Sequence, residues 1–365
     1  MRVTMPVLFA YLALTNNSYK PPMEQEFTAN VNNQIDIPVV INNPRKHTSK
    51  AVVIMIPGTG GFTRNMKFGN SGTDRDNIFK NISVSLTQNG FSTARFDERG
   101  YSCNQSPTAS ERCRNVNDIS KISSNTQQDD TRKVYDLVKG KYTINDCIIL
   151  MTFSEGIIPV SKLLEKRLIS PKGIVAVSAP MDSPTNLMQW QMVGRHMSRL
   201  SIVSSSLKEA QRNKKSYDVN NSTDSDNLTL SDLSNKKSLN LLTAAYKSVM
   251  NDAISRADSE PFIWNGEVMA SYGWWKTWFI DKVPISSRLR YYKGPLTLIY
   301  GSIDSQLSVQ QQIASGSNLT GTINREIKVL NGVGHTLGVD SLLGPMSDGG
   351  SDAILRSIQS QAARC

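Results

Sequence analysis

The chain has 365 residues, of which 39% are hydrophobic and 20% charged, so it can form one large soluble domain with an insertion, or two domains. Its formal net charge is +10, but residues 181–290 carry 14 Lys/Arg against 11 Asp/Glu, a share in proportion to their length. No basic stripe emerges, and the composition therefore argues against a nucleic-acid partner.

The first residues have the form of a secretory signal peptide. Met1-Arg2 is followed by an apolar stretch from Val3 to Leu14 that is too short to cross a bilayer comfortably, and no other stretch could cross one. We expect residues 1–18 to be a signal peptide and the protein to be secreted or periplasmic. A buried N-terminal strand in a cytoplasmic protein is the alternative.

Two of the four cysteines lie close together in a polar loop. If the protein is exported, we expect Cys103 and Cys113 to form a disulfide, because the loop between them is short and turn-forming. Cys147 lies in an apolar run, and Cys365 is the last residue. The cysteines alone do not decide the compartment.

The first predicted elements are a hairpin and a buried strand. Residues 24–42 alternate in polarity around Asn32-Asn33, which predicts a hairpin, and 51–56 is a continuous apolar run. The strand ends in Pro57-Gly58-Thr59-Gly60-Gly61, a loop whose backbone N–H groups could form part of an oxyanion hole. A phosphate-binding loop is the competing interpretation, but the Gly-Lys-Ser/Thr ending is missing.

Strands and helices then alternate up to residue 180. This alternation predicts a doubly wound α/β fold with a mostly parallel sheet and reactive loops at its carboxyl edge. The predicted elements are a strand at 91–96, a helix at 127–138, a strand at 147–151, a helix at 157–168 and a strand at 173–177.

The strand at 147–151 leads into Thr152-Phe153-Ser154-Glu155-Gly156 and then into a helix. A serine between small residues at a strand-to-helix turn is the sequence form of a nucleophile elbow, with the helix N-terminus beside the serine. A serine that merely caps the helix is the simpler interpretation of such a match taken alone.

The alternation stops between residues 181 and 290. Ser183-Pro184 starts one helix, residues 242–253 have the apolar spacing of a second, and a polar loop at 216–231 separates them. We interpret this stretch as a helical cap over the sheet edge. Met188, Trp274 and Trp275 are candidates for lining an acyl pocket, although simple packing of cap on core explains each equally well.

The sheet pattern resumes with a strand at 295–300 that ends near Asp304, and a strand at 326–330 that precedes His335. Ser154, Asp304 and His335 thus each follow a strand, in the order typical of the α/β-hydrolase fold. Together with the loops at 57–61 and 97–100, these motifs resemble the α/β-hydrolase superfamily, in particular bacterial serine esterases and lysophospholipase-like and serine-aminopeptidase-like enzymes. The resemblance covers about residues 50–180 and 294–362.

The resemblance implies a role for each matching residue. Ser154 would be the nucleophile, His335 the general base and acid, and Asp304 the group that orients the imidazole. The backbone N–H groups of Thr59 and Glu155 would be the oxyanion donors. It also implies a core formed by residues 19–180 and 291–365 and a cap at 181–290.

Some residues depart from the family pattern or compete for a role. Thr152 stands where glycine is usual and is expected to crowd the elbow, and Pro159 is expected to leave the carbonyl near Glu155 without its partner. Pro57 replaces the usual histidine of the oxyanion loop. Asp182 also follows a strand, but is better explained as a cap of the next helix.

The leading function is a serine hydrolase that cleaves a small-molecule carboxylic ester through an acyl-enzyme. An acyltransferase or a peptidase with the same three residues, or a binding protein of the same fold without chemistry, are alternatives. No metal or organic cofactor is expected, because the chain lacks His/Cys ligand spacing. The oligomeric state stays open.

Overall fold

The structure is a computed structural model that describes residues 23–45, 49, 51–68, 72–101, 114–142, 147–197, 236–317, 319, 325–339 and 344–365. The expected signal peptide (1–18), His47, Cys103, Cys113 and the polar loop at 216–231 lie outside the described residues.

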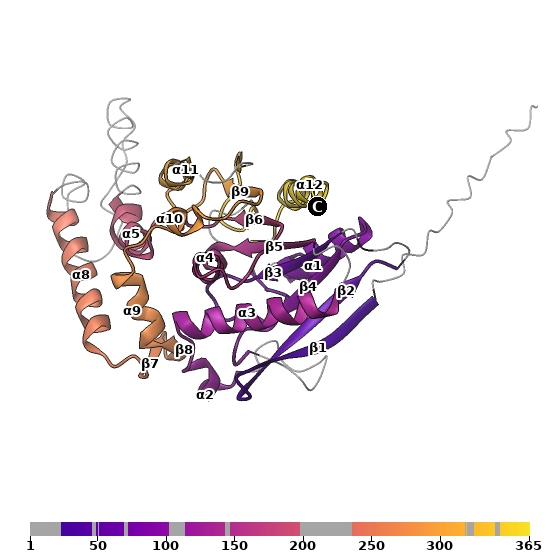
Figure 1. The fold of residues 1–365 in the computed structure, drawn as a ribbon. Helices are drawn as coiled ribbons and strands as arrows, with labels where there is room; N and C mark the ends of the chain where they lie inside the picture. The colour runs from indigo at the N-terminus through magenta and orange to yellow at the C-terminus, as the bar shows by residue number, and fades with distance from the viewer. Residues whose placement is uncertain are drawn as a thin grey trace, which may run out of the picture.

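An eight-stranded sheet runs through the centre of the molecule (Figure 1). Its order is β1-β2-β4-β3-β5-β6-β9-β10; the pairs β1–β2 and β2–β4 are antiparallel and the others parallel. This confirms the predicted doubly wound, mostly parallel sheet. The strands are β1 (Met23–Val31), β2 (Ile35–Asn43), β3 (Val52–Ile56), β4 (Ser92–Phe96), β5 (Ile148–Phe153), β6 (Gly173–Val177), β9 (Leu296–Gly301) and β10 (Arg325–Leu330).

The predicted opening hairpin is present as β1 and β2. Asn32 and Asn33 have φ values of 54° and 56°, a left-handed backbone that asparagine tolerates, and the N–H of Gln34 closes the turn by donating to the carbonyl of Val31. The hairpin adds two antiparallel strands to the edge of an otherwise parallel sheet.

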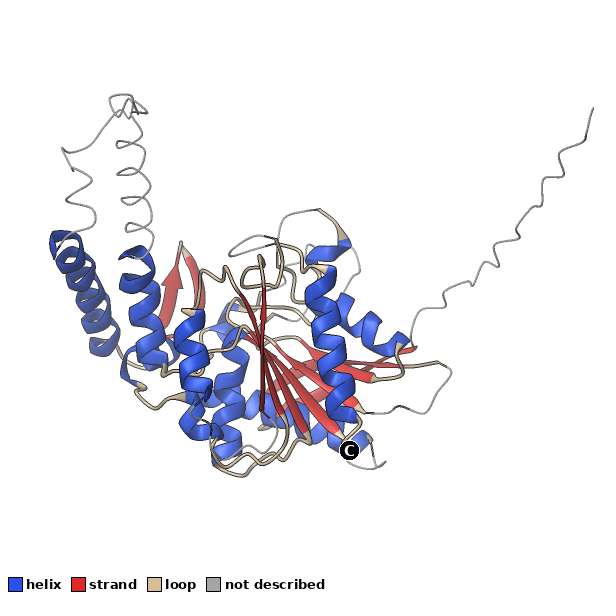
Figure 2. Cartoon of the chain, turned by 90° about the horizontal axis from the view of Figure 1, so that it is seen from above, coloured by secondary structure: helices blue, strands red, loops and turns tan. Residues whose placement is uncertain are grey.

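Helices cover both faces of the sheet, as Figure 2 shows. One apolar cluster joins alternate residues of the central strands to α1 and α12, and the other joins the remaining residues to α3, α4, α10 and α11. Strands buried on both faces need apolar side chains at every position, which explains the continuous apolar runs of the sequence. These helices are α1 (Ile78–Gln88), α3 (Ser124–Lys141), α4 (Ile157–Glu165), α10 (Ile285–Leu289), α11 (Val309–Ser317) and α12 (Asp348–Ala362).

Helices α3 and α4 differ in extent from the sequence prediction, and α3 also continues past residue 138 to Lys141. Helix α3 begins earlier than residue 127, because Ser123 and Thr126 form a capping box at its start. Helix α4 ends at Glu165 rather than at residue 168, since Arg167 takes a left-handed φ of 56°.

The segment between β6 and β9 contains helices and one small hairpin. Helix α5 (Pro184–Gln189) begins where predicted, but its cap is Ser183 and not the expected Asp182. It continues into a wider turn, η3 (Trp190–Gly194). Helices α8 (Lys236–Ser255) and α9 (Tyr272–Ile280) follow, and Figure 1 places α8, α9 and α5 together at the left of the molecule. The hairpin of β7 (Pro261–Trp264) and β8 (Glu267–Ser271) was not predicted.

Candidate active site

Ser154 lies in a sharp turn between β5 and α4. Its φ is 48°, and residues 154–156 form a short 3₁₀ turn before the helix. A Cβ atom on Gly156 would lie 2.6 Å from the carbonyl oxygen of Pro57, so only glycine fits there. The serine therefore stands on the strained strand-to-helix turn that the motif predicted.

The two departures near the elbow do not prevent this geometry. Thr152 is fully buried inside β5, where it pairs with Ile56 and Ala176. The carbonyl of Glu155 cannot receive a hydrogen bond from Pro159, which has no N–H, but it accepts one from the N–H of Ile157 instead. Pro159 lies in the first turn of α4, where N–H groups have no partner within the helix.

His335 and Asp304 lie within hydrogen-bond distance of the serine and of each other. Nε2 of His335 is 3.1 Å from Oγ of Ser154, and Nδ1 is 2.8 Å from Oδ2 of Asp304. The other carboxylate oxygen of Asp304 accepts from the backbone N–H groups of Gln306 and Leu307. In this arrangement, the imidazole can take the proton of the serine hydroxyl while the carboxylate holds the ring.

Backbone contacts hold the loops that carry His335 and Asp304. A Cβ atom on Gly301 would clash with the carbonyl oxygens of Val333 and Gly334, so the two loops touch through backbone. The hydroxyl of Ser178, at the end of β6, donates to the carbonyl oxygen of His335 at 2.6 Å. Four strands thus position the three side chains.

Asp182 has a different place from Asp304. Its Oδ1 accepts from the backbone N–H of Ser183 and from Nδ2 of Asn186, at the start of α5. The residue that caps the helix is Ser183 itself, with Asp182 one position earlier.

The loop from Pro57 to Gly61 packs directly on the elbow. A Cβ atom on Gly58 would lie 2.9 Å from both the carbonyl oxygen of Phe153 and Cβ of Ser154. This close approach brings the backbone of Thr59 beside the serine. The Thr59 hydroxyl is hydrogen-bonded to the side chain of Glu155.

The sequence predicts a role for Glu155 only through its backbone N–H. In the structure, its side chain also makes hydrogen bonds beside the elbow. The carboxyl group is buried, and besides Thr59 it accepts from Nε1 of Trp274 at 2.7 Å and from Nε2 of Gln127 at 3.2 Å. Burial raises the pKa of Glu155, although these hydrogen bonds and the charge of Lys162 partly oppose the rise.

A second carboxyl group, the partly buried Glu98, holds the far end of the same loop. Its Oε2 accepts from the N–H of Phe62 at 2.5 Å, and its own N–H donates to the carbonyl of Phe62. Burial, with the nearby charges of Glu155 and Asp130, raises the pKa of Glu98 to about 8. Both glutamates line a cavity of about 40 Å³, together with residues of α3, of the start of α4 and of the ends of β3 and β4.

Arg99 is committed to an ion pair at this cavity. Its Nε and Nη2 donate to the two carboxylate oxygens of Asp130 at 3.0 and 2.5 Å. This bidentate pair gives Arg99 a structural role.

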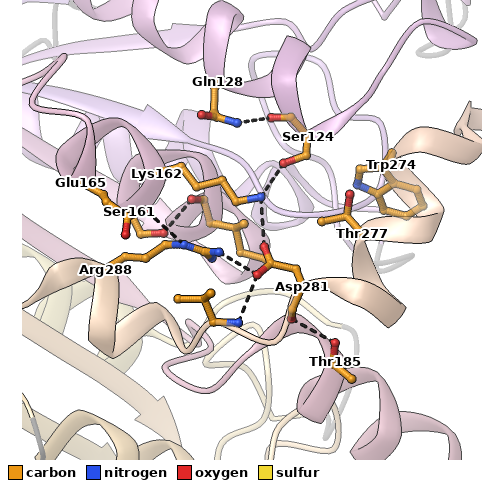
Figure 3. Close-up of polar contacts among 12 residues, drawn as sticks. Ser124, Gln128, Ser161, Lys162, Glu165, Thr185, Trp274, Thr277, Asp281 and Arg288 are labelled. Atoms are coloured by element: carbon orange, nitrogen blue, oxygen red, sulfur yellow. Dashed lines mark hydrogen bonds and ion pairs between the residues drawn. The ribbon is translucent and has the colours of Figure 1, made fainter. Parts of the chain in front are cut away.

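The insertion contacts the core next to the elbow. Figure 3 shows Asp281, at the end of α9, between Lys162 of α4 and Arg288 of α10, at 3.1 and 2.6 Å. Trp274 reaches Glu155, whereas Trp275 stacks on Phe262. Met188 is buried in the larger apolar cluster of the core.

The described part of the chain contains no group of three or more His, Cys, Asp or Glu side chains placed to hold a metal ion. Nor, within those residues, is any helix both long and apolar enough to cross a membrane.

Comparison with known proteins shows the fold. No protein-family model matches the sequence, and no curated protein matches it either. Similar solved structures include a proline iminopeptidase from Mycobacterium smegmatis, with a TM-score of 0.54 and 11% identity over 93% of this chain and 99% of that chain. A thermostable carboxyl esterase from Bacillus coagulans has a TM-score of 0.53 and 14% identity, over 93% and 99% of the two chains. The α/β hydrolase GrgF from a Penicillium species has a TM-score of 0.51 and 16% identity, over 94% and 99%. The chain has the α/β-hydrolase fold.

Proposed function

We propose that this protein is a serine hydrolase that cleaves a carboxylic ester through an acyl-enzyme intermediate. The observation that carries the proposal is the hydrogen-bonded chain from Ser154 through His335 to Asp304, formed by three loops far apart in sequence. The esterase and the iminopeptidase of similar fold support a hydrolase in general terms.

In this reaction, Nε2 of His335 removes the proton of the Ser154 hydroxyl as the oxygen attacks the ester carbonyl. Asp304 keeps the proton on Nδ1 and stabilises the imidazolium that forms. The backbone N–H groups of Thr59 and Glu155 stabilise the oxyanion, a contribution worth roughly a hundredfold or more in kcat for each donor. His335 then protonates the leaving alcohol. In the second half of the reaction, water takes the place of the alcohol, gives a proton to His335 and attacks the acyl-enzyme, which releases the acid.

The insertion is the proposed site of contact with the acyl part of the substrate. Trp275 supports this, because it is only partly buried and lies on the same helix as Trp274. Met188 stays a candidate on the neighbouring helix α5, which packs against α9.

Covalent labelling with a fluorophosphonate tests the proposal. We expect one adduct on the peptide that contains Ser154, absent in Ser154→Ala and greatly slowed in His335→Ala, together with cleavage of short-chain nitrophenyl esters. Asp304→Asn should lose most of its turnover, whereas Asp182→Asn is the matched control. A folded protein that stays unlabelled would contradict the proposal, and cleavage of peptides or acyl transfer to added alcohols would favour the alternatives.

We also propose that the protein works in an oxidising compartment outside the cytoplasm. The disulfide between Cys147 and Cys365 supports this, since such bonds persist mainly in exported proteins. N-terminal sequencing of the mature protein tests it, and an intact Met1 on functional protein would contradict export.

A further inference from the structure

The side chain of Glu155 meets three neutral groups from three different parts of the chain. The hydroxyl of Thr59 lies against Oε2, while the indole N–H of Trp274 and the amide of Gln127 both donate to Oε1. Thr59 belongs to the loop on the elbow, Gln127 to α3 and Trp274 to α9 of the insertion. One oxygen thus receives two donors, and the other faces a group that can either donate or accept.

The cations nearest to Glu155 are paired with other carboxylates, so neither forms an ion pair with the Glu155 side chain. Lys162 of α4 is engaged by the carboxylate of Asp281 at 3.1 Å, and Arg99 by both oxygens of Asp130. Glu98 lines the same cavity and adds a like charge whenever it ionises. An ionised Glu155 would be a buried charge held by neutral donors alone, which is costly.

An ionised Glu155 would also oppose the proposed reaction. Its carboxyl group is attached to the residue after Ser154 and touches Thr59, so it lies beside the place where the oxyanion forms. A full negative charge there would repel the developing one in a water-poor environment.

We propose that Glu155 is a neutral carboxylic acid that positions the oxyanion loop. Oε1 accepts from Trp274 and Gln127, and a proton on Oε2 is donated to Oγ1 of Thr59. The consequence for catalysis rests on the proposed function. Glu155 acts here through Thr59, as a positioning residue, and Trp274 links the insertion to the oxyanion loop. The raised pKa of Glu155 agrees with this assignment.

Infrared spectroscopy tests the protonation state without any substrate. A neutral carboxylic acid has a carbonyl stretch separate from that of a carboxylate. At neutral pH we expect one such band to vanish in Glu155→Gln and to persist in Glu98→Gln, which should lose a different band, because the pKa of Glu98 is about 8. If Glu155→Gln removes no band, Glu155 is ionised and the proposal is overturned.

Kinetics and amide hydrogen exchange test the positioning. Thr59→Val keeps the backbone N–H but loses the hydroxyl. Trp274→Phe loses the indole donor together with part of the ring. A misplaced oxyanion loop should lower kcat by about a hundredfold in Glu155→Ala with little change in KM. We expect Glu155→Gln to restore most of this loss, since its amide offers the same acceptor and donor.

The matched control is Trp278→Phe, on the same helix and as buried as Trp274 (6% and 8% exposed). Peptide 57–62 should exchange faster in Thr59→Val and Trp274→Phe than in this control. Equal exchange and equal kcat across the three variants would overturn the positioning role. If peptide 57–62 exchanges faster in the two variants but no fluorophosphonate labels the protein, the serine-hydrolase function is contradicted, whereas the contact of Glu155 with the oxyanion loop is supported.

Discussion

Replacing Glu98 by glutamine should remove a pH dependence from the stability of the fold. The ordinary pKa of this carboxyl group is 4.5, and in the folded protein it is about 8. Between these values the folded state binds a proton that the unfolded state has released. Stability therefore falls as the pH rises through this window, by about 1.4 kcal/mol per pH unit.

The size of the effect follows from the width of the window. From pH 4.5 to pH 7, ionisation of the unfolded chain costs the wild-type protein about 3 kcal/mol of unfolding free energy. Glutamine at position 98 cannot ionise, and its side-chain oxygen can still accept from the N–H of Phe62. The variant should therefore gain about 3 kcal/mol relative to wild type between pH 4.5 and pH 7.

Urea denaturation at intervals from pH 4.5 to pH 8 measures this difference. Glu326→Gln is a suitable control for the loss of a carboxylate, because the side chain of Glu326 is half exposed. Parallel curves for Glu98→Gln and wild type would show that Glu98 ionises normally in the fold. The reasoning about the carboxyl pair at the oxyanion loop would then fail.

The disulfide, the elbow glycine and the charge cluster at Asp281 each allow a direct test. Cys365→Ser opens the bond to Cys147, which closes a loop across 218 residues, and chain entropy puts the loss at about 5 kcal/mol; unchanged urea midpoints would contradict this. Gly156→Ala should slow fluorophosphonate labelling by about a hundredfold, because its Cβ would press on the carbonyl of the neighbouring loop; labelling at the wild-type rate would show that the turn can yield. Asp281→Asn should cost about 3 kcal/mol at pH 7, because it removes the negative charge that pairs with buried Arg288 and with Lys162. Burial alone would raise the pKa of Asp281, but its hydrogen bonds and neighbouring cations lower it, so this cost should shrink as the pH falls below about 3.8 towards the lowered pKa.

The central strands and the order of the site residues could be predicted because local pattern and burial agree there. Strand β6 has the predicted bounds, since a strand covered on both faces must be apolar at every position. Ser154, Asp304 and His335 follow strand ends, and parallel strands bring their carboxyl ends to one edge. The three side chains therefore meet although up to 181 residues separate them.

Other features depend on contacts that no local pattern shows. The disulfide joins residues 147 and 365, which are neighbours only after the sheet has formed. The hairpin β7–β8 did have a signal in Asn265-Gly266, a favoured two-residue turn, with φ values of 50° and 80° in the structure. It was missed because the flanking residues were interpreted as part of a helical insertion.

The backbone of the site and its charge state are specified by different kinds of residue. Gly58, Gly156 and Gly301 allow the loops to touch, and a glycine-rich pattern after each strand is visible in the sequence. The protonation of Glu98 and Glu155 depends instead on which side chains enclose them, including Trp274 from an insertion more than a hundred residues away. The local sequence around Glu155 does not indicate that its carboxyl group is buried. The burial, and with it the raised pKa, comes from side chains that are distant in the sequence. Motif order therefore predicts where the chemistry can occur, whereas the pH at which it operates has to be inferred from packing.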